Sequence, residues 1–224
     1  MWDGKVLWVT SAAGGPAFEG CGLSCGLPAE PGAIYGVNFK DGVPNFDVIA
    51  DSEPHGLCGS GLVDLISYLV RSGKLSSIGQ FAPSIPREGF ALVEDKQGIV
   101  LTKGDVDVFQ RAKAAIGSGI NVLLTQADMG YEDLQRVCVG GAFGHFLNII
   151  NAQNIGLLPQ IPPNFVELCG NTALAGCEDV LLSSVAYQHL NDLRDKARVI
   201  NLSQCPDFDA LFFENLYLQP VGSD

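Results

Sequence analysis

The chain has 224 residues, of which 47% are hydrophobic and 17% charged, and its formal net charge is −12. This composition is that of a globular protein with a substantial core, and the acidic balance without a basic cluster argues against binding to a nucleic-acid backbone. No apolar run reaches the roughly 20 residues that span a bilayer, and the N-terminus lacks a signal-peptide pattern, so we expect a soluble cytoplasmic protein with no membrane partner.

The seven cysteines are odd in number and widely spread along the chain. This usage suits reduced thiols in the cytosol better than a disulfide framework. The closest pair, Cys21 and Cys25, does not have the CxxC spacing of zinc sites, and no histidine lies near it in the sequence. We therefore expect no metal site in this chain.

The first part of the chain predicts a strand, a hairpin and a helix. KVLWV (5–9) is typical of a strand. AIYGVNF (33–39) and FDVIA (46–50) flank a turn and predict a β-hairpin. A glycine-rich turn then opens a helix at about Ser60, and Gly73 is its expected end.

The central part predicts a second hairpin followed by a long helix. FALVE (90–94) and GIVLT (98–102) are the two expected strands. Thr102 and Asp105 have the spacing of a capping box, with Asp in place of the preferred Glu or Gln, and predict a helix over about 103–126.

The last part continues the alternation of strands and helices. We expect strands at 136–139, 165–169 and 198–201, one long helix over about 172–195, and a short terminal helix. Because no linker-like segment interrupts the alternation, we expect residues 1–224 to form one α/β unit with hairpin additions.

Lys113 is the first candidate site residue, because it lies in the apolar face of the long predicted helix. An ammonium group in such a face must reach water along its flexible stem or meet a polar partner. In one interpretation Lys113 snorkels at the edge of the face, and in the other Lys113 and Gln110 reach a bound polar ligand. The apolar residues that share this face are Val106, Phe109, Ile116, Ile120 and Leu123.

Two glycine-rich turns are the other candidates. Gly59, Ser60 and Gly61 directly precede a helix, where free N–H groups and the helix dipole suit an anion, although the spacing matches neither GxGxxG nor GxxxxGK[ST]. Each turn can also be a plain connection that binds nothing.

The second turn follows the strand at 136–139. Gly140 and Gly141 can adopt positive φ and let the backbone approach a flat ring, with Ala142 and Phe143 beside them.

No self-contained catalytic site follows from the residues. Glu19, Glu30 and Asp64 lie in or beside glycine-rich segments and are candidates for general-base or metal-linked roles, but caps and solvated carboxylates have the same pattern. HExxH is absent from the sequence, and the three histidines are too scattered for a recognisable catalytic set. The catalytic residues stay unassigned.

Six motifs taken together resemble a known family. Their order is that of the reductive activators of corrinoid proteins, ATP-dependent iron–sulfur proteins whose C-terminal domain belongs to the acetate and sugar kinase, Hsp70 and actin superfamily. The motifs are SAAGGPAFEG (11–20), GLCGSGLVDL (56–65), QRAKAAIGSGI (110–120), VGGAFGHFLN (139–148), NIGLLP (154–159) and GNTALAGCEDVLLS (170–183).

The resemblance implies a fold and a function. The fold is the C-terminal half of an actin/Hsp70-like (ribonuclease H-like) ATPase domain, a mixed sheet flanked by helices with hairpin additions. The function is repair: an electron from an iron–sulfur cluster, driven by ATP, returns a Co(II) methyltransferase or corrinoid iron–sulfur protein to Co(I). VGGAFG is similar to the adenosine motif, which implies that Gly140 and Gly141 lie against adenosine and makes Lys113 and Gln110 candidate nucleotide contacts.

The sequence also departs from the family pattern. It contains neither DxGT phosphate motifs nor an iron–sulfur domain, so the ATP–Mg²⁺ site is expected to be partial and the cluster to lie outside this chain. We expect the chain alone to hydrolyse no ATP at a useful rate. The alternatives are a docking or dimerisation module for a corrinoid protein, and part of a small-molecule kinase of the same superfamily.

Overall fold

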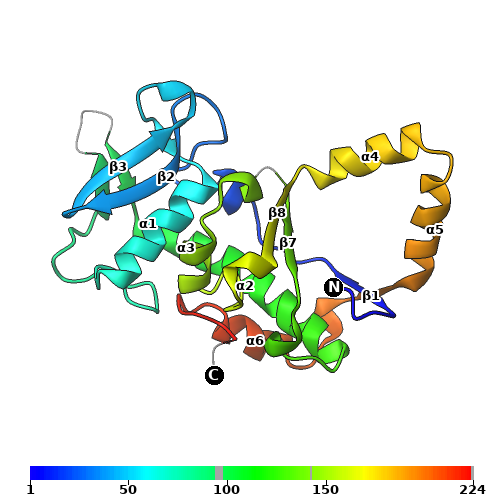
Figure 1. The fold of residues 1–224 in the computed structure, drawn as a ribbon. Helices are drawn as coiled ribbons and strands as arrows, with labels where there is room; N and C mark the ends of the chain where they lie inside the picture. The colour runs from blue at the N-terminus through cyan, green and yellow to red at the C-terminus, as the bar shows by residue number, and fades with distance from the viewer. Residues whose placement is uncertain (94–97, 142, 223–224) are drawn as a thin grey trace.

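Helix α2 (Lys103–Gln126) runs through the middle of the molecule, with the other elements arranged around it (Figure 1). The computed structural model describes residues 1–93, 98–141 and 143–222. The other strands and α-helices, in chain order, are β1 (Leu7–Thr10), β2 (Ala33–Lys40), β3 (Val43–Val48), β4 (Gly56–Leu57), α1 (Gly59–Arg71), β5 (Phe90–Val93), β6 (Ile99–Leu101), β7 (Val137–Gly140), α3 (Ile149–Asn154), β8 (Val166–Gly170), α4 (Thr172–Leu182), α5 (Ala186–Lys196), β9 (Ala197–Ile200) and α6 (Phe208–Glu214).

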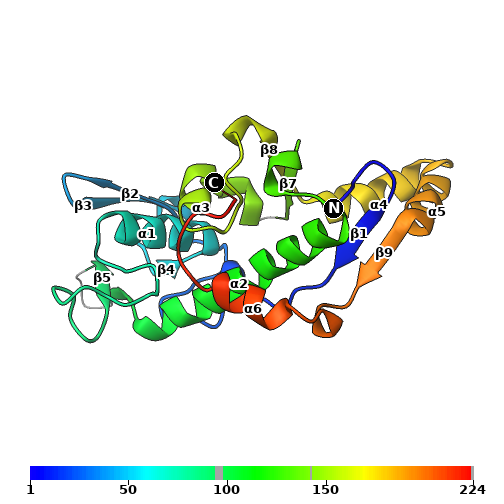
Figure 2. The same cartoon turned by 90° about the horizontal axis from the view of Figure 1, so that it is seen from below.

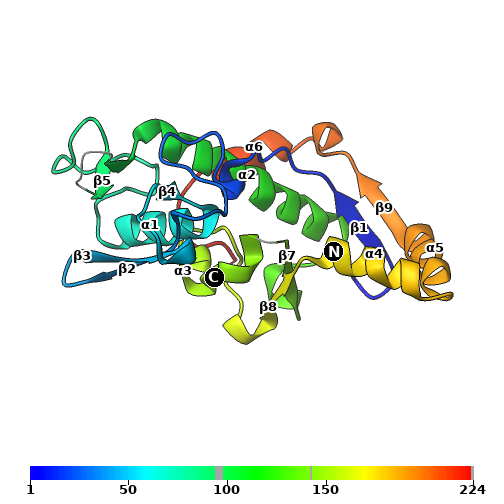
Figure 3. The same ribbon diagram turned by 90° about the horizontal axis from the view of Figure 1, so that it is seen from above.

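The strands divide among small sheets. The sheet β3-β2-β4 is mixed, because β2 pairs antiparallel with β3 and parallel with β4. β5 and β6 form an antiparallel pair, while β1 pairs in parallel with β9 and β7 with β8. Figures 2 and 3 show β1, β9, α4 and α5 at one end of the molecule and the β2–β3 hairpin at the other. The expected α/β architecture with hairpin additions is therefore confirmed.

Most of the predicted elements are found close to their expected bounds. Both hairpins are present, as β2–β3 and β5–β6. Helix α1 begins one residue before the expected Ser60, and Gly73 follows it with φ +68°, a conformation that glycine adopts readily. Helix α2 has the predicted bounds.

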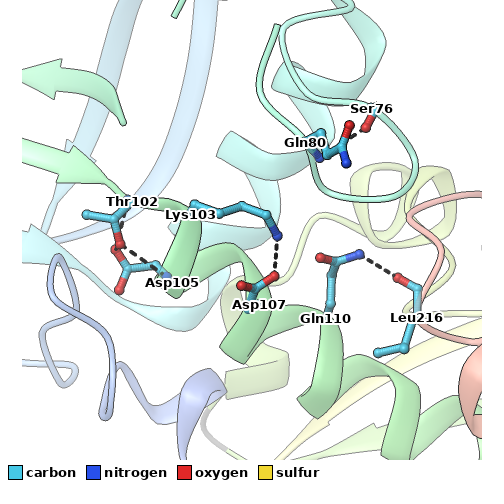
Figure 4. A network of polar contacts seen from close by, with 8 residues as sticks. All are labelled: Ser76, Gln80, Thr102, Lys103, Asp105, Asp107, Gln110 and Leu216. Atoms are coloured by element: carbon cyan, nitrogen blue, oxygen red, sulfur yellow. Dashed lines mark hydrogen bonds and ion pairs between the residues drawn. The ribbon is translucent and has the colours of Figure 1, made fainter. Parts of the chain in front are cut away.

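The capping box at the start of α2 is also present. The Thr102 hydroxyl accepts from the Asp105 N–H at 3.2 Å, and the Asp105 carboxylate accepts from the Thr102 N–H at 2.9 Å; Figure 4 shows the two side chains in contact. Asp105 accepts from Ser24 as well, through the backbone N–H and the hydroxyl, each at 2.6 Å. Asp105, although its side chain is shorter than the usual Glu or Gln, thus completes the cap and also anchors the preceding glycine-rich segment to the helix.

The prediction of one helix over 172–195 is wrong, because the structure has two helices, α4 and α5. The break follows Leu182, where Ser183 has extended backbone angles, φ −120° and ψ 124°. Serine competes with helical hydrogen bonding through its own hydroxyl. No residue of α4 or α5, both fully described, is buried. Packing against the rest of the protein therefore does not stabilise a single continuous helix here.

The core lies where α1, β2 and the first half of α2 meet. Four α1 leucine and isoleucine side chains, together with Ile34 and Phe109, are completely buried in it. By contrast, α4, α5 and the turn between them expose large apolar side chains, which are Leu174, Leu181, Leu182, Val185, Tyr187, Leu190 and Leu193. This end of the molecule thus contributes little to the core.

We predict that Thr102→Ala lowers the free energy of unfolding by about 1 kcal/mol, because the variant loses the hydroxyl that caps α2. Thr125→Ala is the matched control, since that exposed hydroxyl only donates to the Asn121 carbonyl within the same helix, and we expect a change below about 0.5 kcal/mol. Urea denaturation followed by circular dichroism measures both. Equal effects of the two substitutions would contradict the role of the cap.

Candidate functional site

A cleft of about 700 Å³ lies beside the turn that follows β7. One wall comes from the second half of α2, through Ile116, Ile120 and Leu123. The opposite wall is β7 and the turn itself, and Phe18 and Phe143 also line the cleft. The cleft is thus mostly apolar, with Glu19 and Arg136 among its few charged lining residues.

The turn presents bare backbone to this cleft. Gly141 has φ +99°, and nothing described lies within 4 Å of the place where a Cβ atom would stand. Its N–H donates to the Gly170 carbonyl at 2.6 Å, which ties the turn to the end of β8. At Gly140 a Cβ atom would come within 2.8 Å of the Thr172 hydroxyl oxygen. Both positions therefore favour glycine, Gly141 for its backbone angle and Gly140 for the close approach of α4.

Phe143 connects the cleft to the core. Its ring lies 5.1 Å from the Phe18 ring, and Phe18 in turn meets Phe109 edge to face at 5.5 Å. This aromatic chain fixes one end of the cleft to the buried part of α2. Ala142 lies outside the described residues, so the structure places only its neighbours.

Gly59, Ser60 and Gly61 are buried and do not belong to the residues that line the cleft. A Cβ atom at Gly59 would stand 2.0 Å from the Phe18 carbonyl oxygen, and one at Gly61 would stand 2.4 Å from that of Ile34. The Ser60 hydroxyl donates to the Tyr35 carbonyl at 2.7 Å. In this chain the three residues let α1 pack closely on its neighbours, and their contact with an anion stays a prediction.

Lys113 and Gln110 face the C-terminal segment, away from the cleft. The Lys113 ammonium group donates to the carbonyl oxygens of Asn215 at 2.7 Å and Tyr217 at 2.8 Å. The Gln110 amide donates to the Leu216 carbonyl at 2.8 Å, as Figure 4 shows. The snorkelling interpretation is wrong, since the Lys113 side chain is 0% exposed. Burial lowers its pKa to about 8.

These two side chains hold the end of the chain on α2. Three successive carbonyl groups, from 215 to 217, receive their hydrogen bonds. Leu218 follows with 1% exposure, and its N–H donates to the Ser77 carbonyl at 2.7 Å. The role of Lys113 and Gln110 as nucleotide contacts stays a prediction of the resemblance, and their contacts in this structure are with the protein's own backbone.

The three candidate carboxylates lie in different places. Glu19 lines the cleft, and Glu30 is exposed. Asp64 is 7% exposed and accepts from the Val37 N–H at 3.1 Å and from the Asn151 amide at 2.7 Å. Burial is the largest influence on the Asp64 carboxyl group, and it raises the pKa of that group. The structure therefore gives Asp64 a role in joining β2 to α3 and brings no acid–base pair together at these positions.

Sequence reasoning missed the α2 wall of the cleft. Ile116, Ile120 and Leu123 have helical spacing, which predicts a core face, and in the structure they are only partly buried. The one signal available was the length of the apolar stripe, which runs from Val106 to Leu123.

The family of this chain follows from its similarity to known proteins. The sequence model described as "C-terminal domain of RACo the ASKHA domain" matches residues 1–224. The chain belongs to this family. The family predicted from the six motifs is confirmed. The predicted fold, that of the acetate and sugar kinase, Hsp70 and actin (ASKHA) superfamily, is confirmed as well.

Two relatives of this chain carry names from corrinoid activation. The "Corrinoid activation enzyme RamQ" of Eubacterium limosum is 35% identical over 93% of this chain and 39% of its own length. The "[Co(II) methylated amine-specific corrinoid protein] reductase" of Methanosarcina barkeri is 27% identical over 96% of this chain and 42% of its own length. The chain therefore spans about two fifths of the length of these two relatives.

A solved structure agrees with this assignment. The protein named "Reductive activator for corrinoid,iron-sulfur protein" has a TM-score of 0.86 and 32% identity, and the match covers 94% of this chain and 36% of that chain. Among the residues that the structure describes, no helix combines the length and the apolar character needed to cross a membrane.

The buried contacts of Lys113 generate a stability prediction. Lys113→Met leaves the Asn215 and Tyr217 carbonyls without their donor, and we expect a loss of about 2 kcal/mol or more in unfolding free energy. Lys103→Met is the control, because Lys103 forms an exposed ion pair with Asp107 (Figure 4) and should cost below about 0.5 kcal/mol. Urea titrations measure both variants. A Lys113→Met protein as stable as the wild type would show that these contacts do not hold the C-terminal segment.

Proposed function

We propose that this chain is the adenosine-binding, C-terminal part of an ATP-dependent reductive activator that returns Co(II) corrinoid proteins to Co(I). The observation that carries the proposal is the bare backbone at Gly140 and Gly141 on the wall of an apolar cleft. The names of the relatives supply the reaction, since they are corrinoid activators and a Co(II) corrinoid protein reductase.

The shape and chemistry of the cleft suit a purine. A purine is flat and presents two largely apolar faces, so it favours a slot with apolar walls and a few polar groups. Here the isoleucines of α2 form one wall, and the other consists of β7 and the glycine turn, where Gly140 and Gly141 have no side chains. At such a turn the ring can approach the main chain closely, and backbone N–H and C=O groups can meet its edge.

The described residues suit the phosphates and Mg²⁺ of the nucleotide less well than they suit the purine. Mg²⁺ prefers carboxylate and phosphate oxygens, and among the described lining residues of the cleft Glu19 is the single carboxylate. The sequence has no DxGT motif. We therefore propose that residues outside this chain hold Mg²⁺ and the phosphates, and that the chain alone binds adenine nucleotide weakly and hydrolyses none.

The remaining components of the reaction also lie outside this chain in our proposal. An iron–sulfur cluster elsewhere supplies the electron, and the partner is a corrinoid protein, either a methyltransferase component or a corrinoid iron–sulfur protein. We place the activity in the cytoplasm, because the seven cysteines are all unpaired in the structure and such thiols stay reduced there.

Docking or self-association is a second candidate, favoured by the exposed apolar side chains of α4 and α5. Exposed apolar patches of this kind often mark protein interfaces. Nucleotide dependence separates the two candidates. If the first is right, capture of a purified corrinoid protein by a polypeptide that carries this chain behind a DxGT-bearing segment should change on addition of ATP and Mg²⁺. Capture that is equal with and without nucleotide would favour a docking module, and sedimentation of the chain alone would reveal a homodimer.

We predict that Gly141→Ala weakens adenine-nucleotide binding at least about tenfold, because a Cβ atom would occupy the bare wall and φ +99° strains any L-residue. Calorimetry should use a polypeptide that carries this chain behind a DxGT-bearing segment, so that the phosphates are also held. Gly73→Ala is the control for backbone strain, since Gly73 also has positive φ and open space but lies at the end of α1. Unchanged affinity in Gly141→Ala would contradict the assignment.

A further inference from the structure

The outer face of the β7–β8 pair carries a cluster of metal-ligating side chains. Alternate residues of a strand point to opposite faces, and Val137, Val139 and Leu168 pack against the core. The other face presents Cys138 from β7, with Glu167 and Cys169 from β8. The two thiol sulfurs and a carboxylate oxygen all lie within 4.8 Å of one another.

We propose that Cys138, Glu167 and Cys169 form a binding site for a thiophilic divalent cation of the Zn²⁺ class, with a fourth position open to solvent. The expectation of no metal site considered only cysteines close in sequence. The strand pairing places Cys138 directly opposite Glu167, although the two are 29 residues apart. The proposal does not depend on the nucleotide function proposed above.

The geometry is close to what a tetrahedral site requires. Zn–S bonds of about 2.3 Å and Zn–O bonds of about 2.0–2.2 Å at tetrahedral angles put the ligand atoms about 3.5–3.8 Å apart. Separations of at most 4.8 Å therefore need to shorten by about 1.3 Å or less. Cys138 and Glu167 are exposed, so rotation of their side chains can supply this movement without a change in the strands.

The ligand set selects the class of cation. Two thiolates favour soft or borderline ions such as Zn²⁺ over Mg²⁺ and Ca²⁺, which prefer oxygen ligands. On binding, each thiol releases one proton to solvent, and the two thiolates and one carboxylate then surround the 2+ ion with a net charge of −1. The Arg136 guanidinium, 3.4 Å from the Glu167 carboxylate, is placed to offset this charge.

Binding at this site would affect the neighbouring cleft. Cys138 is itself a cleft-lining residue, and Gly140 and Gly141 follow it in the sequence. A cation held from both strands would cross-link β7 to β8 directly before the glycine turn and reduce the freedom of the turn.

Titration of the reduced 224-residue chain with Co²⁺ tests the site, since Co²⁺ in tetrahedral thiolate coordination gives characteristic visible and near-ultraviolet absorption. We expect one Co²⁺ per chain, displacement by Zn²⁺ and release of two protons. Cys138→Ser and Cys169→Ser should abolish the thiolate bands, and Glu167→Gln should weaken binding about tenfold or more. Cys177→Ser, which removes an exposed cysteine of α4 outside the cluster, should bind like the wild type.

A second readout separates binding from misfolding. Zn²⁺ should raise the melting temperature of the wild type and of Cys177→Ser, and should leave Cys138→Ser unchanged, with all three proteins showing the same circular dichroism without metal. Retention of the thiolate bands in Cys138→Ser or Cys169→Ser, or their loss in Cys177→Ser, would overturn the proposal.

Discussion

The structure depends on how α2 is covered along its length. Its first half is sealed, since Val106, Phe109, Ala112 and Lys113 are completely buried. Its second half keeps Ile116, Ile120 and Leu123 only partly covered, and these form a wall of the cleft. One continuous helix thus belongs to the sealed core along its first half and contributes a wall of the cleft along its second half. On this side the wall of the cleft continues into the packed core, since Ile116 packs against the core and also lines the cleft.

The polar residues in the sealed half of α2 explain how this arrangement is closed. A buried ammonium or amide group is costly unless its donors are satisfied. Lys113 and Gln110 satisfy theirs with three backbone carbonyls of the C-terminal segment. The hydrogen bonds hold residues far apart in the sequence together, so the last residues of the chain help to cover α2. The lysine that first suggested a ligand therefore has a structural contact in this chain.

Local sequence signals predicted the elements well, and long-range contacts account for what was missed. The capping residues gave the start of α2, and alternation with turn residues gave both hairpins, because these signals act within a few residues. The break between α4 and α5 was missed because the apolar periodicity continues across Ser183. What is absent there is packing, which sequence patterns do not report.

The contacts of the candidate site residues depend on distant parts of the chain. The partners of Lys113 lie about a hundred residues away, and the Cys138–Glu167 pairing depends on strand register. The glycine turn after β7 could be found because a double glycine after a strand is a local feature, whereas the cleft beside it depends on α2.

The central claim is that an adenine nucleotide lies against the main chain at residues 140–141. Hydrogen–deuterium exchange locates this contact directly, in a polypeptide that carries this chain behind a DxGT-bearing segment, with and without ADP and Mg²⁺. The account predicts slower exchange of the amides at 138–143 and of the α2 segment at 116–123 when nucleotide is bound. Nucleotide binding proved by calorimetry, with exchange in both segments unchanged, would contradict it.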